Sequence, residues 1–177
     1  SHYKASLLAV PLMQKRGGGL IVNTNSPGCS LYAVNVAYGM GKCAIDKMTA
    51  DMAMELATED IHVVSWWAGV PMQTDEILAG GVDGGSARRG LAPGLDRVPT
   101  FRSLYHTALA TTLLFEGRAL AALARDTRRG LFSGLAIISA QLGRRYGVRD
   151  ERDLCPPSFI SLKYQLSLWL PPFLAWA

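Results

Sequence analysis

The fold follows from three consecutive segments of the chain: LIV at residues 20–22, AYGMGKCAIDKMTADMAMELATE at 37–59 and IHVVSWW at 61–67. The first is short and wholly apolar, and the third is short and apolar except for His62 and Ser65, a pattern typical of strands covered on both faces. The second alternates apolar and polar residues with helical periodicity, so it predicts an amphipathic helix. A buried strand, a helix and a second buried strand predict a βαβ unit with parallel strands, and hence an α/β fold with a three-layer parallel sheet.

Two helices are expected to pack on this sheet, and the pattern of each assigns a buried face. For the helix at 37–59, the predicted apolar face consists of Ala44, Ile45, Met48, Met52 and Leu56. Its charged residues are expected on the opposite, solvated side: Asp46, Lys47, Asp51 and Glu55. For an earlier helix at 3–15, the predicted stripe consists of Leu7, Leu8, Leu12 and Met13, with Pro11 kinking the helix or marking its first turn.

The remainder of the chain is less regular. Residues 79–100 are rich in Gly, Arg and Pro and predict a long irregular loop, followed by helical stretches at 103–115 and 117–126. A last strand is expected at 135–139 and a polar segment at 141–153. We divide the chain into a domain portion at 1–155 and an apolar tail at 156–177. The tail either packs against protein or lies in a membrane interface through its tryptophans.

Composition excludes several classes of function. The net charge is +4, but acidic residues interrupt the arginines of the second half and no nucleic-acid motif accompanies them, so we expect no nucleic-acid partner. Three cysteines without a CxxC pair exclude a disulfide framework and favour a reducing environment. With three histidines, none at ligand spacing, we predict no metal site.

One group of polar residues is predicted to meet at a single edge of the sheet. Ser26 follows the first strand, and Tyr38 and Lys42 lie one turn apart at the start of the returning helix. Gly69 follows the second strand. Because ligands of open parallel sheets bind beyond the carboxyl ends of the strands, these residues form the candidate site.

A hydroxyl, a phenol and an amine so arranged suit proton transfer to a carbonyl or from an alcohol. A free phenol has a pKa of about 10, and a nearby ammonium group stabilises the phenolate form. The serine hydroxyl can hold the substrate oxygen by a hydrogen bond. No side chain supplies hydride, so the chemistry demands a nicotinamide cofactor.

The Ser...Tyr-x-x-x-Lys pattern resembles the short-chain dehydrogenase/reductase family, whose fold is a Rossmann-like sheet. The resemblance implies that Tyr38 is the acid/base, that Lys42 binds the nicotinamide ribose and that Ser26 orients the carbonyl. It also implies cofactor contacts at Tyr38, Lys42, Gly69, Val70 and Thr74. Ser26 precedes Tyr38 by twelve residues against the family's thirteen, and Ala68 replaces the proline of the family's Pro-Gly turn.

Three further segments resemble one member of the family in particular: SPG at 26–28, QT at 73–74 and RRYGVRD at 144–150. That resemblance implies NADP(H) rather than NAD, carbonyl substrates such as steroids or xenobiotic ketones, and a place on the cytosolic face of the endoplasmic reticulum, with the cytoplasm as the alternative. A homo-oligomer is a separate expectation. The apolar tail would then touch the membrane peripherally.

The family's glycine-rich turn, TGxxxGIG, does not occur in these 177 residues. We therefore expect the chain to be the C-terminal half of the Rossmann-like domain and to bind NADPH poorly by itself. The alternative is a catalytically silent protein that binds a partner or a membrane through its apolar surfaces.

Overall fold

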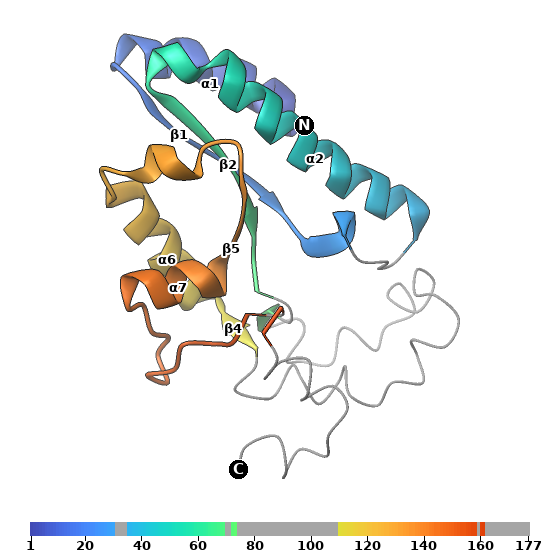
Figure 1. Cartoon of the computed structure of the whole chain (residues 1–177), viewed down its shortest axis with the longest axis vertical. Helices are drawn as coiled ribbons and strands as arrows, with labels where there is room; N and C mark the ends of the chain where they lie inside the picture. The colour runs from blue at the N-terminus through green and yellow to red at the C-terminus, as the bar shows by residue number, and fades with distance from the viewer. Residues whose placement is uncertain (31–34, 70–71, 74–109, 159, 162–177) are drawn as a thin grey trace. The chain divides into compact units, whose positions relative to one another are not determined.

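The computed structural model describes residues 1–30, 35–69, 72–73, 110–158 and 160–161 (Figure 1). These residues fall into two compact units. The first contains residues 1–67 and 121–137, and the second contains 68–120 and 138–177.

The first unit is built on a parallel sheet, and the α/β fold with parallel strands that the sequence predicts is confirmed. The strand order is β1-β2-β5. The elements, in chain order, are α1 (His2–Lys15), β1 (Gly19–Asn25), η1 (Pro27–Cys29), α2 (Val36–Glu55), η2 (Ala57–Glu59), β2 (Ile61–Trp67), η5 (Arg129–Phe132) and β5 (Ala136–Ile138), of which Ile138 belongs to the second unit.

Strands β1 and β2 pair in parallel along their whole length. Gly19 is opposite Ile61 at one end, and Asn25 is opposite Trp67 at the other. The segment between them contains α2, so β1, α2 and β2 form the predicted βαβ unit. The strand at 20–22 is longer than its apolar core suggests, because the polar residues Asn23 to Asn25 continue the pairing.

Both long helices lie along the same side of β1 and β2 (Figure 1). The buried cluster between them and the sheet consists of Ile21, Met52, Ile61 and Val63. Residues packed against that cluster come from both helices: Val10, Met13, Met48, Ala53 and Leu56. The predicted apolar face of α2 is therefore correct at Met48, Met52 and Leu56 and wrong at Ala44, which is exposed.

The predicted stripe of α1 is wrong at its three leucines. Leu7, Leu8 and Leu12 are 52%, 68% and 63% exposed. The side turned to the sheet carries Ser6, Val10 and Met13 instead, spaced by four and three residues. Met13 packs closely on Gly19, where a Cβ would lie 2.8 Å from its sulfur.

The second unit contains a short parallel pair, β3 (Met72–Gln73) with β4 (Thr111–Thr112), the start of α6 (Leu113–Arg125), and α7 (Ser139–Tyr146). The sequence predicts a helix at 103–115, but the structure describes only residues 110–115 of this range, and Thr111–Thr112 form strand β4. The hydroxyl of Thr112 accepts the backbone N–H of Phe115, so Thr112 caps α6 and the helix begins at 113.

The predicted polar segment at 141–153 begins as helix α7, which the sequence pattern missed. Its buried residues include Leu142 and Gly143, and a Cβ at Gly143 would lie 2.3 Å from the ring of Phe115. The helix ends at Gly147, which has a φ of +64°. The expected loop at 79–100 and most of the tail at 156–177 lie outside the described residues.

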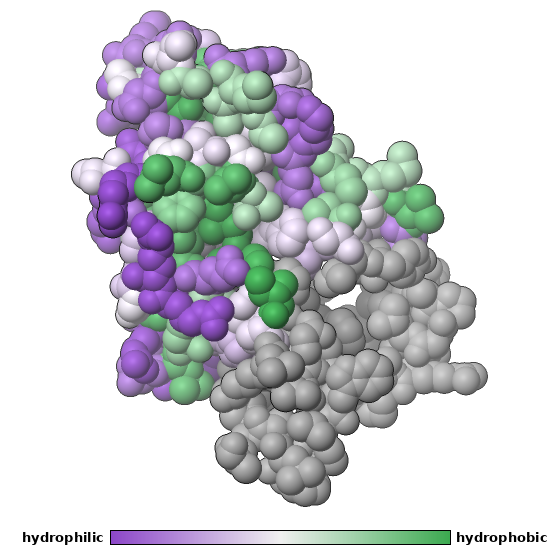
Figure 2. Space-filling view, in the orientation of Figure 1, coloured by the Kyte–Doolittle hydropathy of each residue, from purple (hydrophilic) through white to green (hydrophobic). Residues whose placement is uncertain are grey.

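Hydrophilic and hydrophobic residues are interspersed on the face of the described residues that Figure 2 shows. None of the helices described is long and apolar enough to cross a membrane.

Candidate functional site

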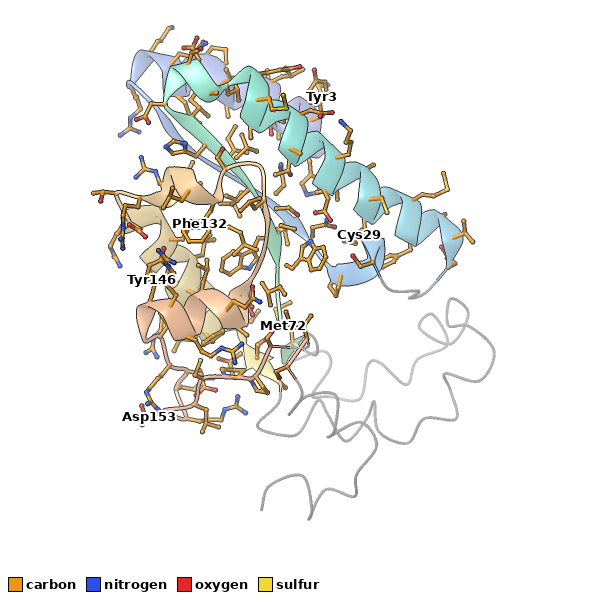
Figure 3. All side chains as sticks on the ribbon, viewed as in Figure 1. Tyr3, Cys29, Met72, Phe132, Tyr146 and Asp153 are labelled. Carbon is orange, nitrogen blue, oxygen red and sulfur yellow. The ribbon has the colours of Figure 1, made fainter. Side chains whose placement is uncertain are left out.

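The candidate site of the first unit forms where β1 ends and α2 begins. Ser26 follows β1 in extended backbone, and the η1 turn then brings the chain beside the first turns of α2, as Figure 3 shows with Cys29 labelled. Asn35 is the N-cap of α2, and its side-chain oxygen accepts the backbone N–H of Tyr38 at 2.9 Å. This cap fixes the first helical turn, and with it the position of Tyr38.

The structure brings Ser26, Tyr38 and Lys42 together. The Ser26 Oγ and Tyr38 OH atoms are 2.7 Å apart, a hydrogen bond in which either hydroxyl can be the donor. The Nζ atom of Lys42 lies 5.2 Å from the centroid of the Tyr38 ring. The ammonium group, the phenol and the hydroxyl therefore share one side of α2. The catalytic roles that the sequence assigns to them stay predictions.

Gly28 is packed against this group so tightly that only glycine fits. A Cβ at Gly28 would lie 2.5 Å from Cε1 of Tyr38 and 3.2 Å from Cγ of Lys42. The η1 backbone therefore packs directly against the phenol ring of Tyr38. Gly41, in contrast, has open space where a Cβ would stand, so the structure gives no packing reason for that glycine.

Asp46 lies on the sheet side of α2, which corrects the prediction that it faces solvent. Its Oδ1 accepts hydrogen bonds from three side chains at the strand ends, with donor atoms Asn25 Nδ2, Ser65 Oγ and Trp67 Nε1. The spacing contained the signal for this residue, because Tyr38, Lys42 and Asp46 follow one another at intervals of four and so share a helix face.

The electrostatics of this network differ between its carboxyl and its thiol. Burial alone would raise the pKa of the Asp46 carboxyl, but the donors around it, including the Cys29 thiol, outweigh burial and hold that pKa below its ordinary value. Burial, and next the hydrogen bond to Asp46, raises the pKa of the Cys29 thiol. At neutral pH the site therefore holds a carboxylate and a protonated thiol.

A second thiol, that of Cys43, connects α2 to η1 by a hydrogen bond. The Cys43 sulfur lies 3.4 Å from the backbone oxygen of Cys29, to which its thiol donates. All three cysteines are free, and among the described residues no group of three His, Cys, Asp or Glu side chains could hold a metal ion.

The turn after β2 belongs to the second unit. The backbone N–H of Gly69 donates to Oε1 of Glu116 at 2.9 Å, and the same oxygen accepts from Ser139 Oγ at 2.8 Å. A Cβ at Gly69 would lie 2.0 Å from the Cγ2 atom of Thr111. No sequence pattern predicts this role for Glu116. The predicted cofactor contacts at Val70 and Thr74 lie outside the described residues.

The first 76 residues carry the family assignment. Residues 1–76 match the family model described as short chain dehydrogenase, which is the family that the sequence resembles.

Two curated relatives match almost the whole chain. The chain is 34% identical over 174 residues to human dehydrogenase/reductase SDR family member 1, and this covers 94% of the chain and 50% of the relative. It is 34% identical over 178 residues to the mouse protein of the same name, covering 98% of the chain and 54% of the relative. The chain thus spans about half the length of the curated relatives it matches.

A solved structure supports the fold independently. A 7α-hydroxysteroid dehydrogenase complexed with NADH and 7-oxo glycochenodeoxycholic acid superimposes with a TM-score of 0.55 and 21% identity, covering 77% of the chain and 49% of that protein. At this identity the likeness concerns the fold alone.

Proposed function

We propose that the chain carries the catalytic residues of an NADP-dependent oxidoreductase that interconverts carbonyls and alcohols. The observation that supports this most is the 2.7 Å contact between the hydroxyls of Ser26 and Tyr38, with the ammonium group of Lys42 beside the Tyr38 ring. In this proposal Tyr38 is the general acid/base, Ser26 holds the substrate oxygen, and Lys42 binds the cofactor's ribose.

The residues present suit a nicotinamide cofactor at this place. Lys42 stands beside the Tyr38 ring, and the three N–H donors of its ammonium group suit the hydroxyls of a ribose. Gly28 leaves the backbone close to Tyr38 and Lys42, with no side chain of its own to fill the space. When bound, the cofactor supplies the hydride that no side chain can provide.

The chain's own residues then complete the reduction of a carbonyl. The Ser26 hydroxyl donates a hydrogen bond to the carbonyl oxygen and so fixes its position. As the carbonyl carbon gains hydride, negative charge develops on the oxygen, and the phenolic proton of Tyr38 moves to it, which gives the alcohol. The positive charge of Lys42 stabilises the phenolate that remains. In the direction of oxidation the same groups act in reverse.

The preference for NADP over NAD and the use of steroids or xenobiotic ketones are the finer parts of the proposal. They rest on the likeness to dehydrogenase/reductase SDR family member 1. The structural relative was solved with NADH, so both cofactors belong in the test. The cytosolic face of the endoplasmic reticulum is likewise proposed, and fractionation of cells expressing the chain with and without residues 156–177 tests it.

The experiment uses two proteins. One is the 177-residue chain itself. The other, called the fused protein below, is this chain preceded by the N-terminal half of the human relative. Each is offered a panel of steroid and small aromatic ketones with NADPH and with NADH, and the consumption of reduced cofactor is followed. We expect activity from the fused protein, greater with NADPH, and weak or no cofactor binding by the chain alone.

A pair of tyrosine variants tests the role of the phenol. In the fused protein Tyr38→Phe should lower kcat by about a hundredfold or more and leave cofactor affinity nearly unchanged. The control is Tyr3→Phe, because Tyr3 is 53% exposed on α1 and lies outside the site. Turnover by Tyr38→Phe at the rate of Tyr3→Phe would remove Tyr38 from the mechanism.

A further inference from the structure

The Asp46 carboxylate joins α2 to both strands directly beneath the candidate site. It accepts a hydrogen bond from Asn25 Nδ2 on β1 at 2.7 Å. On β2 it accepts hydrogen bonds from Ser65 Oγ at 2.5 Å and from Trp67 Nε1 at 3.2 Å. The strand register explains this convergence. Asn25 is paired with Trp67, and Ser65 is two residues earlier on the same face of β2.

The contact between α2 and the sheet changes character along the helix. Near its C-terminal end Met52 packs on Ile21 and Val63 in the apolar cluster. One turn earlier Thr49 accepts a hydrogen bond from Asn23 at 3.0 Å, and the next turn is that of Asp46. The polar part of the contact thus lies at the end of the helix that carries Tyr38 and Lys42. There the hydrogen bonds, and not apolar packing, set the distance of the helix from the strands.

The charge of Asp46 also fixes the amide of Asn25. Nδ2 of Asn25 donates both to Asp46 and to the backbone oxygen of Lys42 at 3.0 Å, so a flipped amide would place its oxygen against two acceptors. In the observed orientation Asn25 Oδ1 is buried without a hydrogen-bond partner among the described residues. An unsatisfied buried acceptor is unfavourable, so the two donated bonds dominate. Through Asn25, the carboxylate therefore also holds the backbone of Lys42.

From these contacts we propose that Asp46 is a positioning residue for the reaction: its carboxylate holds the first turns of α2 so that Tyr38 and Lys42 stand opposite Ser26. This rests on the proposed function. Ser26 follows Asn25 directly in the chain, so Asp46 fixes the two sides of the Ser26–Tyr38 contact through one anchor. In Asp46→Asn the charge is lost, and the new amide can donate a hydrogen bond to Asn25 Oδ1. The Asn25 amide can then flip, which breaks its hydrogen bond to the backbone oxygen of Lys42.

The test compares Asp46→Asn with Asp51→Asn. Asp51 lies on the same helix, but its carboxylate is 49% exposed and, among the described residues, pairs with the exposed Lys47. In the fused protein, well below each variant's melting temperature, Asp46→Asn should lower kcat by roughly tenfold to a hundredfold. Because Lys42 is held through the same anchor, the Michaelis constant for the cofactor should rise by about threefold or more, and Asp51→Asn should match the parent protein.

A second measurement does not depend on turnover. In the 177-residue chain, the NMR signal of the Trp67 indole proton, assigned with Trp67→Phe, should move in Asp46→Asn and stay in place in Asp51→Asn. An unmoved indole signal would overturn the network. A moved signal with kcat within threefold of the parent would overturn the positioning role. An inactive parent protein against every ketone would instead remove the proposed function, and with it the catalytic role of Asp46.

Discussion

Replacing Gly28 by alanine is the sharpest perturbation of the site that the structure offers. The new Cβ would stand 2.5 Å from Cε1 of Tyr38, 3.1 Å from its Cδ1 and 3.2 Å from Cγ of Lys42. Two carbon atoms in contact are about 3.5 Å apart, so the ring or the η1 backbone must move by about 1 Å. The substitution therefore acts on the phenol without changing any polar group.

The size of the effect follows from the hydrogen bond between Ser26 and Tyr38. A movement of about 1 Å away from Ser26 would lengthen the 2.7 Å contact to about 3.7 Å, which is no longer a hydrogen bond. Misplacement on this scale lowers turnover by about a hundredfold. The crowding itself should destabilise the folded chain by about 1–3 kcal/mol.

Gly41→Ala is the matched control, because it makes the same chemical change on α2 where nothing lies within 4 Å of the new Cβ. It should stabilise the helix by about 0.5–1 kcal/mol and leave turnover unchanged. Ketone reduction by the fused protein and thermal unfolding of the 177-residue chain measure the two effects. If Gly28→Ala reduces ketones within threefold of the rate of Gly41→Ala, the phenol is not where the reaction needs it, and the reasoning fails.

Three further predictions concern stability, each measured by thermal unfolding. Because the folded-state pKa of Asp46 lies below its ordinary value, its carboxylate stabilises the fold above the ordinary pKa. The difference in melting temperature between the parent chain and Asp46→Asn should therefore be largest near pH 7 and shrink as pH falls below about 4; a constant difference would contradict this. Gly69→Ala should destabilise by about 1–3 kcal/mol, since its Cβ would stand 2.0 Å from Thr111, and an unchanged melting temperature would show that this turn is loose. Arg152→Ala should destabilise the fold by roughly 2–3 kcal/mol, because it leaves the fully buried carboxylate of Asp150 without its ion pair. The effect is smaller than for a fully buried pair, since Arg152 is 32% exposed, and a loss of stability under about 0.5 kcal/mol would refute the prediction.

The βαβ unit was predictable from the sequence because each of its parts carries a strong, local pattern. LIV and IHVVSWW are apolar on both faces, and the helix between them shows Met48 and Met52 on its buried side. The meeting of Ser26 with Tyr38 followed from topology alone, since a strand end and the start of the next helix share an edge of the sheet.

What the sequence did not predict depends on contacts between distant residues. Val10 and Met13 of α1 pack against the buried cluster of the sheet, whereas Leu7, Leu8 and Leu12 are exposed. Asp46 was assigned to solvent because a charged residue usually lies there, and its donors come from residues about twenty positions away on two strands. The four-residue spacing from Tyr38 and Lys42 places Asp46 on their face of the helix, but it does not identify the strand residues that bind its carboxylate.

The central claim is that Tyr38 delivers a proton to a carbonyl that receives hydride at this site, and isotope transfer tests it most directly. The fused protein is incubated with a responsive ketone and NADPH deuterated at the nicotinamide C4, and the alcohol is analysed by mass spectrometry. We predict deuterium on the carbinol carbon with the parent protein and at least a hundredfold less labelled product with Tyr38→Phe. Equal labelling by the two proteins, or none by the parent with any ketone, would contradict the claim.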